Sequence, residues 1–202
     1  MRRALRCTLS SVAKKAPAKK KRADSDPNPK VELVARRGSE LAAKGDYSNA
    51  LAHFEKVLSV DPKHLYALYG AAHCKSLLME HLSTGERDAA IDGVLALCHR
   101  LILRTPEASL DPDKKEHVFP RETLRFAWDK IASYALDRAK TKRDLEVALG
   151  HIDHCLSLTS PLDPKNALAN YIDTKVRILL RIGRKDDALA LKPERKSRRS
   201  LG

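Results

Sequence analysis

Aromatic residues and long apolar runs are scarce in this sequence. Aromatic side chains make up 4% of the 202 residues, whereas residues with high helix propensity dominate. This composition favours a helical bundle or helical solenoid over a sheet protein. No apolar run approaches the roughly 20 residues that a membrane-spanning helix needs, so no transmembrane segment is predicted. At this length, one domain is the default expectation.

Cysteine is also scarce, and the spacing is not that of a disulfide framework. The four cysteines are Cys7, Cys74, Cys98 and Cys155, and no secretory signal precedes them. A reducing, intracellular compartment fits this pattern best, and the cytoplasm is favoured.

Sequence signatures of catalysis and of metal binding are missing. No G-x-S-x-G, G-x-x-x-x-G-K or G-x-G-x-x-G motif occurs. Cys-His neighbours such as His151, His154 and Cys155 suggest a metal site, but adjacent helical residues point about 100° apart and zinc needs three or four converging ligands. We therefore predict that the protein is not an enzyme and has no cofactor and no metal site.

The net charge of +13 is concentrated at the two ends of the chain. Residues 1–30 hold ten Lys or Arg and two Asp, which gives +8, and residues 191–202 hold five Lys or Arg and one Glu, which gives +4. Only +1 is left for residues 31–190. The basic ends predict an electrostatic contact with RNA, DNA or an acidic protein face, and they do not indicate that the central part binds nucleic acid.

The N-terminal segment 1–30 is expected to be a disordered basic arm, because it is rich in lysine and interrupted by proline. Its first twelve residues lack acids and resemble a mitochondrial transit peptide. Residues 17–22, PAKKKR, resemble a nuclear localisation patch. A solvated arm, or an extension from an upstream start codon, is the remaining alternative. The mitochondrion and the nucleus therefore stay open beside the cytoplasm.

Residues 31–64 predict two short antiparallel helices. One continuous helix face in the second half carries Tyr47, Ala50, Leu51, Phe54, Val57 and Leu58. Gly45 separates the halves and can take the left-handed conformation that ends a helix. Asp61-Pro62 closes the unit with a capping carboxylate and a proline at the first position of the next helix.

This hairpin resembles a tetratricopeptide repeat (TPR), a helical hairpin of about 34 residues. The positions at which that family places small, apolar, turn, aromatic and closing residues are occupied here by Gly38, Leu41, Gly45, Tyr47, Ala50, Phe54 and Pro62. The sequence departs from the family pattern at Val34, Arg37 and Val57. The resemblance implies a binding scaffold built from stacked hairpins.

Two further hairpins and a partial one are predicted downstream. Helices are expected over 65–82 and 86–104, with Gly85 as the turn glycine and Ala90 five residues later. The third pair is expected over 123–140 and 144–157, where Ala148 repeats the position of Ala50. A helix ending at Gly183 is followed by Ala188 and by a closing helix that stops near residue 191. The fold expected is all-α, a short right-handed α-solenoid of about three hairpins plus a partial one, over residues 31–191, with a basic tail at 192–202.

The resemblance implies that the first helix of each hairpin lines a peptide-binding groove. Matching positions place Glu32, Ala35 and Ser39 there in the first unit, and Tyr66, Tyr69 and His73 in the second. The two tyrosines and the histidine either grip a peptide or pack against the neighbouring helix. In the last unit, counting from Gly183 gives Asn170, Asp173 and Arg177, and counting from Pro164 gives Leu168, Tyr171 and Lys175.

Two further predictions concern the residues of this groove and the single tryptophan. Some TPR proteins clamp a C-terminal carboxylate with basic residues, and Ala35 and Ser39 indicate that this clamp is absent. Trp128 shares a helix face with Leu124 and Ile131, which favours core packing over ligand stacking.

We therefore expect a non-enzymatic protein–protein interaction module, an adaptor or assembly subunit that holds a peptide or helix in a concave groove. The alternative is a component of a ribonucleoprotein or other nucleic-acid complex that docks through its basic tails.

Overall fold

The residues that the structure describes form helices and no strands. The computed structural model describes residues 28–163 and 168–191. Eight α-helices follow one another in these ranges: α1 (Pro29–Ala43), α2 (Tyr47–Val60), α3 (Leu65–Leu78), α4 (Thr84–Arg104), α5 (Val118–Arg138), α6 (Lys142–Ser157), α7 (Ala169–Ile182) and α8 (Lys185–Ala190). Three single-turn 3-10 helices join them: η1 (Met79–His81), η2 (Glu107–Ser109) and η3 (Lys115–His117).

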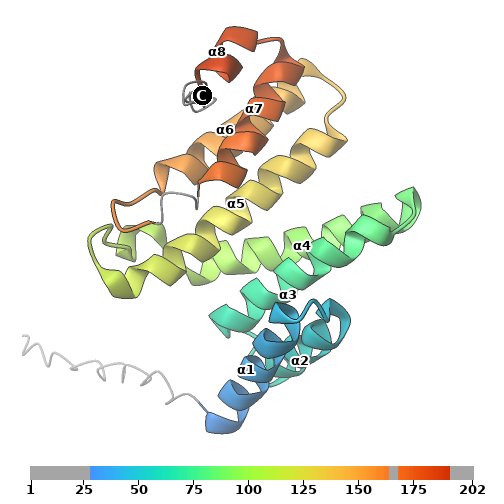
Figure 1. The fold of residues 1–202 in the computed structure, drawn as a ribbon, viewed down its shortest axis with the longest axis vertical. Helices are drawn as coiled ribbons and strands as arrows, with labels where there is room; N and C mark the ends of the chain where they lie inside the picture. Colours follow the sequence, from blue (N-terminus) through green and yellow to red (C-terminus); the bar gives the residue numbers. More distant parts are fainter. Residues whose placement is uncertain (1–27, 164–167, 192–202) are drawn as a thin grey trace, which may run out of the picture.

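Consecutive helices pack side by side as hairpins, as Figure 1 shows. The pairs α1–α2, α3–α4 and α5–α6 form three hairpins, and α7 with the six-residue α8 forms a shorter fourth. Neighbouring hairpins pack through α2–α3, α4–α5 and α6–α7. The prediction of an all-α repeat fold with three hairpins and a partial terminal one is confirmed.

Two of the hairpin turns contain a left-handed glycine. Gly45 has φ 82° and Gly183 has φ 96°, a conformation in which a Cβ atom would be strained. Asp46 then caps α2, since its carboxylate accepts a hydrogen bond from the backbone N–H of Asn49 at 3.3 Å. The alanines at the matching position of α2, α6 and α8 are almost completely buried, namely Ala50, Ala148 and Ala188.

The second hairpin departs from the predicted register. Ser83 precedes α4, and its backbone N–H donates to Glu86 Oε2 at 3.2 Å, so α4 begins at Thr84. Gly85 therefore lies in the first helical turn, and its prediction as the turn glycine is wrong. As a result Ala90 is only half-buried, and the next residue, Ile91, takes the buried position.

Helix α5 begins five residues earlier than predicted, at Val118 rather than at residue 123. Pro120 is the third residue of α5, where a missing N–H breaks no helical hydrogen bond. The backbone N–H of Asp111 donates to His117 Nδ1 at 2.9 Å, and Arg121 donates to the carbonyl of Asp111 at 2.7 Å. These contacts fix the connector to the start of α5.

The predicted arm 1–30 lies outside the described residues except for its last three, and the tail 192–202 lies entirely outside them. Asn28 caps α1 by accepting a hydrogen bond from the backbone N–H of Lys30, and Pro29 is the first helical residue. The helical part therefore begins two residues earlier than predicted.

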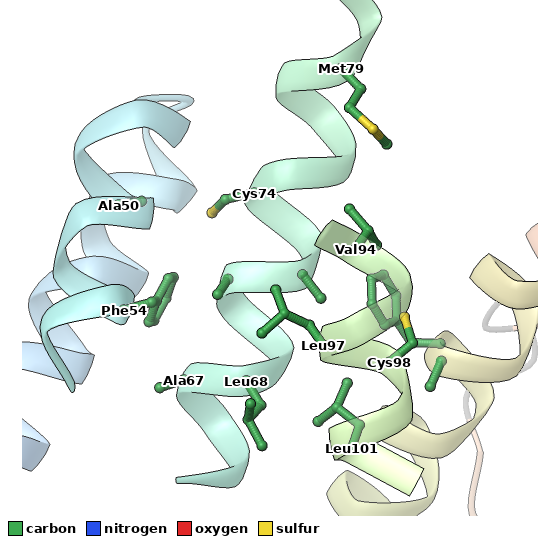
Figure 2. Close-up of a cluster of buried hydrophobic side chains, with 14 of the residues drawn as sticks. Ala50, Phe54, Ala67, Leu68, Cys74, Met79, Val94, Leu97, Cys98 and Leu101 are labelled. Carbon is green, nitrogen blue, oxygen red and sulfur yellow. The ribbon is translucent and has the colours of Figure 1, made fainter. Parts of the chain in front are cut away.

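The core consists of a large cluster over α1–α5 and smaller clusters over α5–α8. Trp128 is partly buried and packs against both the first and the second cluster, so it belongs to the core rather than to an open surface. In the first cluster Phe54 of α2 points toward α3, as Figure 2 shows. A Cβ added at Gly38 would lie 3.0 Å from this ring, and one added at Gly70 would lie 2.5 Å from it. The two glycines therefore allow α1 and α3 to close around Phe54.

The first helices of the hairpins are not equally close to one another. The backbones of α1 and α3 are in contact, and so are those of α5 and α7. The backbones of α3 and α5 do not make the same close contact, and these helices meet through larger side chains.

Candidate functional site

The predicted binding residues of α1 make polar contacts with the second hairpin. Glu32 Oε1 lies 3.1 Å from Nε2 of His64, the residue that caps α3. The hydroxyl of Tyr66 donates a hydrogen bond to Ser39 Oγ at 2.6 Å. The structure thus joins two of the predicted groove residues, Ser39 and Tyr66, across the boundary between hairpins.

Five ring side chains meet between α3 and α5. Tyr69 lies 5.0 Å from Phe126 and 5.9 Å from Phe119 between ring centroids, with edge-to-face geometry in both pairs. The Tyr66 ring is 5.6 Å from Phe119, and the His73 ring is 6.0 Å from Phe126. We term these five residues the aromatic cluster.

The aromatic cluster is intermediate between core and open surface. Phe126 is buried, Tyr66, Tyr69 and His73 are half-buried, and Phe119 is 37% exposed. The α3 residues therefore pack against the neighbouring helix and also keep part of their surface accessible. That they bind a partner stays a prediction.

Burial favours the neutral forms of Tyr69 and His73 in the aromatic cluster. Burial raises the pKa of the Tyr69 phenol above its usual value, and the negative charge of Glu122 adds to the effect. Burial lowers the pKa of His73, and the positive charge of Lys130 adds to that effect. Both rings are therefore uncharged near pH 7 and present an amphipathic surface.

Sequence reasoning did not identify the α5 side of this face, which comprises Phe119, Phe126 and Lys130. The Lys130 ammonium lies 5.5 Å from the centroid of the Phe126 ring, within cation–π range. One signal was present, because Pro120 is acceptable in the first turn of a helix. Extending the predicted helix back to Phe119 places that residue two turns before Phe126, on the same face.

The predicted residues of α7 divide according to the register chosen. Counting from Gly183 selects side chains that are all exposed, namely Asn170, Asp173 and Arg177. Counting from Pro164 selects Leu168, Tyr171 and Lys175, of which Tyr171 is buried and donates to Glu122 Oε1 at 2.9 Å. Lys175 is paired with Asp153 at 2.7 Å. Only the first register leaves all three side chains exposed, and in it Arg177 lies 3.8 Å from Asp137.

A buried ion-pair network joins residues 160–163, which follow α6, to α5. The Arg125 side chain is 1% exposed and pairs with Glu122 at 2.5 Å and with Asp163. Asp163 also accepts a hydrogen bond from the backbone N–H of Ser160 at 2.7 Å. Each charged group of the network has an oppositely charged partner, which lowers the cost of burying it, although Arg125 Nε and Asp163 Oδ1 form no hydrogen bond. The network has a structural role.

The Cys-His neighbours do not converge on a metal site. The Cys155 thiol is buried, burial raises its pKa, and it donates to the carbonyl of Arg125 at 3.2 Å. His151 stacks on Trp128 at 5.5 Å between centroids, and His154 lies 2.7 Å from Glu107. Within residues 28–163 and 168–191, no group of three or more His, Cys, Asp or Glu side chains is placed to hold a metal ion.

The two other described thiols are buried as well. Burial raises the pKa of Cys74 to about 11 and that of Cys98 to about 12. Both are therefore protonated at neutral pH, and the thiolate that reacts as a nucleophile is scarce.

Among the helices of residues 28–163 and 168–191, none combines the length and the hydropathy that crossing a bilayer requires.

Comparison with known proteins reveals a likeness in fold alone. No protein-family model matches the chain, and no curated protein matches it. Among solved structures, the chain is similar to one described as the MamA RS-1 ArsTM double mutant, a TPR-like protein, with a TM-score of 0.50 and 18% sequence identity. The match covers 80% of this chain and 70% of that one. At this identity the likeness shows an all-helical, TPR-like repeat architecture and nothing of the activity.

Proposed function

We propose that the protein is a non-enzymatic interaction module that binds a peptide or helix of a partner protein across α1, α3, α5 and α7. The observation that carries the proposal is the half-exposed aromatic cluster on the first helices of two successive hairpins. Adaptor or assembly subunit is the role that such a module performs.

Energetics support this face as a binding site. Aromatic side chains dominate the free energy of many protein interfaces, because each buries a large area while losing little conformational entropy. Here the rings are already held by neighbours, including the hydrogen bond between Tyr66 and Ser39. A partner that covers Phe119 therefore gains apolar burial without the cost of ordering the site.

Charged side chains around the face would set the orientation of a bound segment. Glu32 lies on α1, and Lys130 lies on α5. The exposed residues Asn170, Asp173 and Arg177 of α7 extend the same set of first helices. A segment with apolar anchors for the aromatic cluster and polar residues toward α7 fits this arrangement.

The test begins with the partner and ends with one side chain. The full chain is used to purify partners from the cells that produce it, and the identified partner is then titrated by calorimetry against wild type and Phe119→Ser. The partly exposed Phe119 can be changed without opening the core, and affinity should fall by about ten-fold or more. Val147→Ser on α6, where Val147 is 52% exposed, is the matched control and should change affinity by less than about two-fold. Equal affinity of wild type and Phe119→Ser for every partner would rule out this face.

The alternative function rests on the charge of the chain ends. Docking to RNA or another polyanion through residues 1–30 and 192–202 would use their ten and five Lys or Arg residues. A chain without residues 1–27 and 192–202 separates the two functions. Binding through the ends should disappear with them and should fall steeply with salt in the intact chain, whereas binding across the helices should survive.

A further inference from the structure

A second surface combines an apolar pocket with basic side chains and shares no residue with the aromatic cluster. The pocket has a volume of about 410 Å³ and lies between the α2–α3 turn and the last turns of α4. It is lined by Pro62, Lys63, Leu68, Arg100, Leu103 and Arg104. We term these six residues the α4 pocket.

The apolar part of the α4 pocket is open to a partner. Leu103 is 82% exposed, the highest value for a large apolar side chain in the described residues. Leu68 is buried at the base of the pocket, on the part of α3 that faces Leu101 of α4 (Figure 2). A side chain entering between Leu68 and Leu103 would remove the exposed apolar surface of Leu103 from water and rest on the buried Leu68.

The cations of the α4 pocket have no carboxylate partner within the described ranges. Lys63, Arg100 and Arg104 form no ion pair in these ranges, although Arg100 donates to the carbonyl of Pro62 at 2.6 Å. The one acid of this turn, Asp61, accepts a hydrogen bond from the backbone N–H of Lys63 at 3.0 Å. With three cations and this one neighbouring carboxylate, the pocket is an apolar recess with net positive charge at its rim.

We propose that the α4 pocket binds an acidic, amphipathic segment of a partner protein. An apolar side chain of the segment enters between Leu68 and Leu103, and its carboxylates pair with Lys63 and Arg104 at the rim. This site is additional to the proposed binding face on α1, α3, α5 and α7, and it does not depend on that function.

The chemistry of the pocket decides against other occupants. The ends of the chain are basic, at +8 for residues 1–30 and +4 for 191–202, so their net charge opposes binding to the cations of the pocket. None of the six lining residues is aromatic, whereas sites for single-stranded nucleic acid stack bases on aromatic rings. The exposed Leu103 also favours an apolar side chain over a phosphate backbone.

A neighbouring recess gives the bound segment a path. A pocket of about 390 Å³ shares Arg100 with the α4 pocket and is lined by residues of α2, α3 and α4. Its lining includes the small residues Ala71, Gly93 and Ala96, and its one described acid, Glu55, is already paired with Lys75 at 2.9 Å. The continuation fits a stretch of polypeptide rather than a small ligand.

The experiment uses the full chain and a displayed library of random peptides, selected at about 0.15 M salt, where long-range attraction by the basic ends is screened. Selected peptides are labelled with fluorescein and titrated by anisotropy. We expect them to carry Asp or Glu on either side of a Leu or Phe. The double variant Leu103→Ser with Arg104→Glu should bind them about ten-fold or more weakly.

The matched control makes the same chemical changes on α6, with Val147→Ser and Arg143→Glu. It retains the basic ends, as the test variant does, so any attraction to them cancels in the comparison, and the control should bind within about two-fold of wild type. Phe119→Ser should also bind these peptides normally, which separates this site from the proposed binding face. Lys63→Glu is a second test variant should the double variant lose helicity by circular dichroism.

Three results would overturn the proposal. The first would be selected peptides without acidic residues. The second would be acidic peptides that bind the test variants as tightly as they bind wild type. The third is that the test variants keep peptide affinity and lose affinity for a single-stranded oligonucleotide or for vesicles containing anionic lipid.

Discussion

Helix α3 forms two junctions, with α1 and with α5, and they are built in opposite ways. Toward α1 the chain places Gly38 and Gly70 around the ring of Phe54, so the backbones close and the ring is 2% exposed. Toward α5 it places the aromatic cluster, so the backbones stay apart and several rings remain partly exposed. The size of the residues between helices therefore decides whether a junction becomes core or surface.

The largest difference should come from truncating one phenylalanine at each junction. Phe54→Ala empties a closed site, and the free energy of unfolding should fall by about 3–5 kcal/mol. Phe119→Ala removes a ring that is already 37% exposed, so the loss should be about 1–2 kcal/mol. Urea denaturation followed by circular dichroism measures both variants. Equal losses would show that the two junctions are packed alike.

Overfilling the closed junction should have the next largest effect. A Cβ at Gly70 would lie 2.5 Å from the Phe54 ring, so Gly70→Ala should lower the free energy of unfolding by about 1–3 kcal/mol. Adding Phe54→Leu should restore part of this loss, since the two residues share one space. Gly93→Ala is the control, because nothing lies within 4 Å of its added Cβ; it should raise stability by up to about 1 kcal/mol. A neutral Gly70→Ala would contradict the close packing.

A smaller effect is expected from the hydrogen bond that joins the two junctions. Tyr66→Phe removes the hydroxyl that Ser39 accepts at 2.6 Å, and stability should fall by about 0.5–1.5 kcal/mol. Ser39→Ala in the Tyr66→Phe background should then have almost no further effect, which a double-mutant cycle measures by thermal denaturation. Additive losses would mean that the hydroxyls act independently.

The smallest effect is the contribution of His73, in the aromatic junction, to the pH dependence of stability. Burial and Lys130 lower the pKa of His73 in the folded state, so the unfolded chain takes up a proton first as pH falls. The stabilisation is therefore complete above the ordinary histidine pKa of about 6.5 and is lost progressively below it. His73→Gln should reduce the drop in melting temperature between about pH 7.5 and 5.5, and Phe54→Leu should leave that drop unchanged. An unaltered profile in His73→Gln would exclude His73 as a contributor.

Sequence reasoning works best where neighbours along the chain set the structure. The spacing around Gly45, Ala50 and Phe54 repeats within one hairpin, and helix periodicity is sufficient to locate these residues. The prediction for the second hairpin was wrong at Gly85, because Ser83 and Glu86 form a cap that begins the helix earlier. Two local signals conflicted there, and the cap determined the first residue of α4.

The proposed binding face depends on contacts that local patterns do not contain. Tyr69 and Phe126 are 57 residues apart in the chain, and their pairing depends on the angle at which α5 crosses α3. Ser39 and Tyr66 could be placed on first helices by counting positions, but their hydrogen bond could not. The α4 pocket escapes sequence reasoning for the same reason, since Lys63 and Arg104 are brought together by folding.

Trp128 gives this protein a built-in optical probe. It is the only tryptophan in the chain, it touches both main hydrophobic clusters, and His151 and His154 stand against its indole ring. Burial, followed by the charges of His154 and His99, lowers the pKa of His151, so the stacked imidazole is neutral at pH 7. Indole emission therefore reports separation of the two hydrophobic clusters without any added label. Its quenching by a protonated imidazole reports protonation of the histidines that contact Trp128.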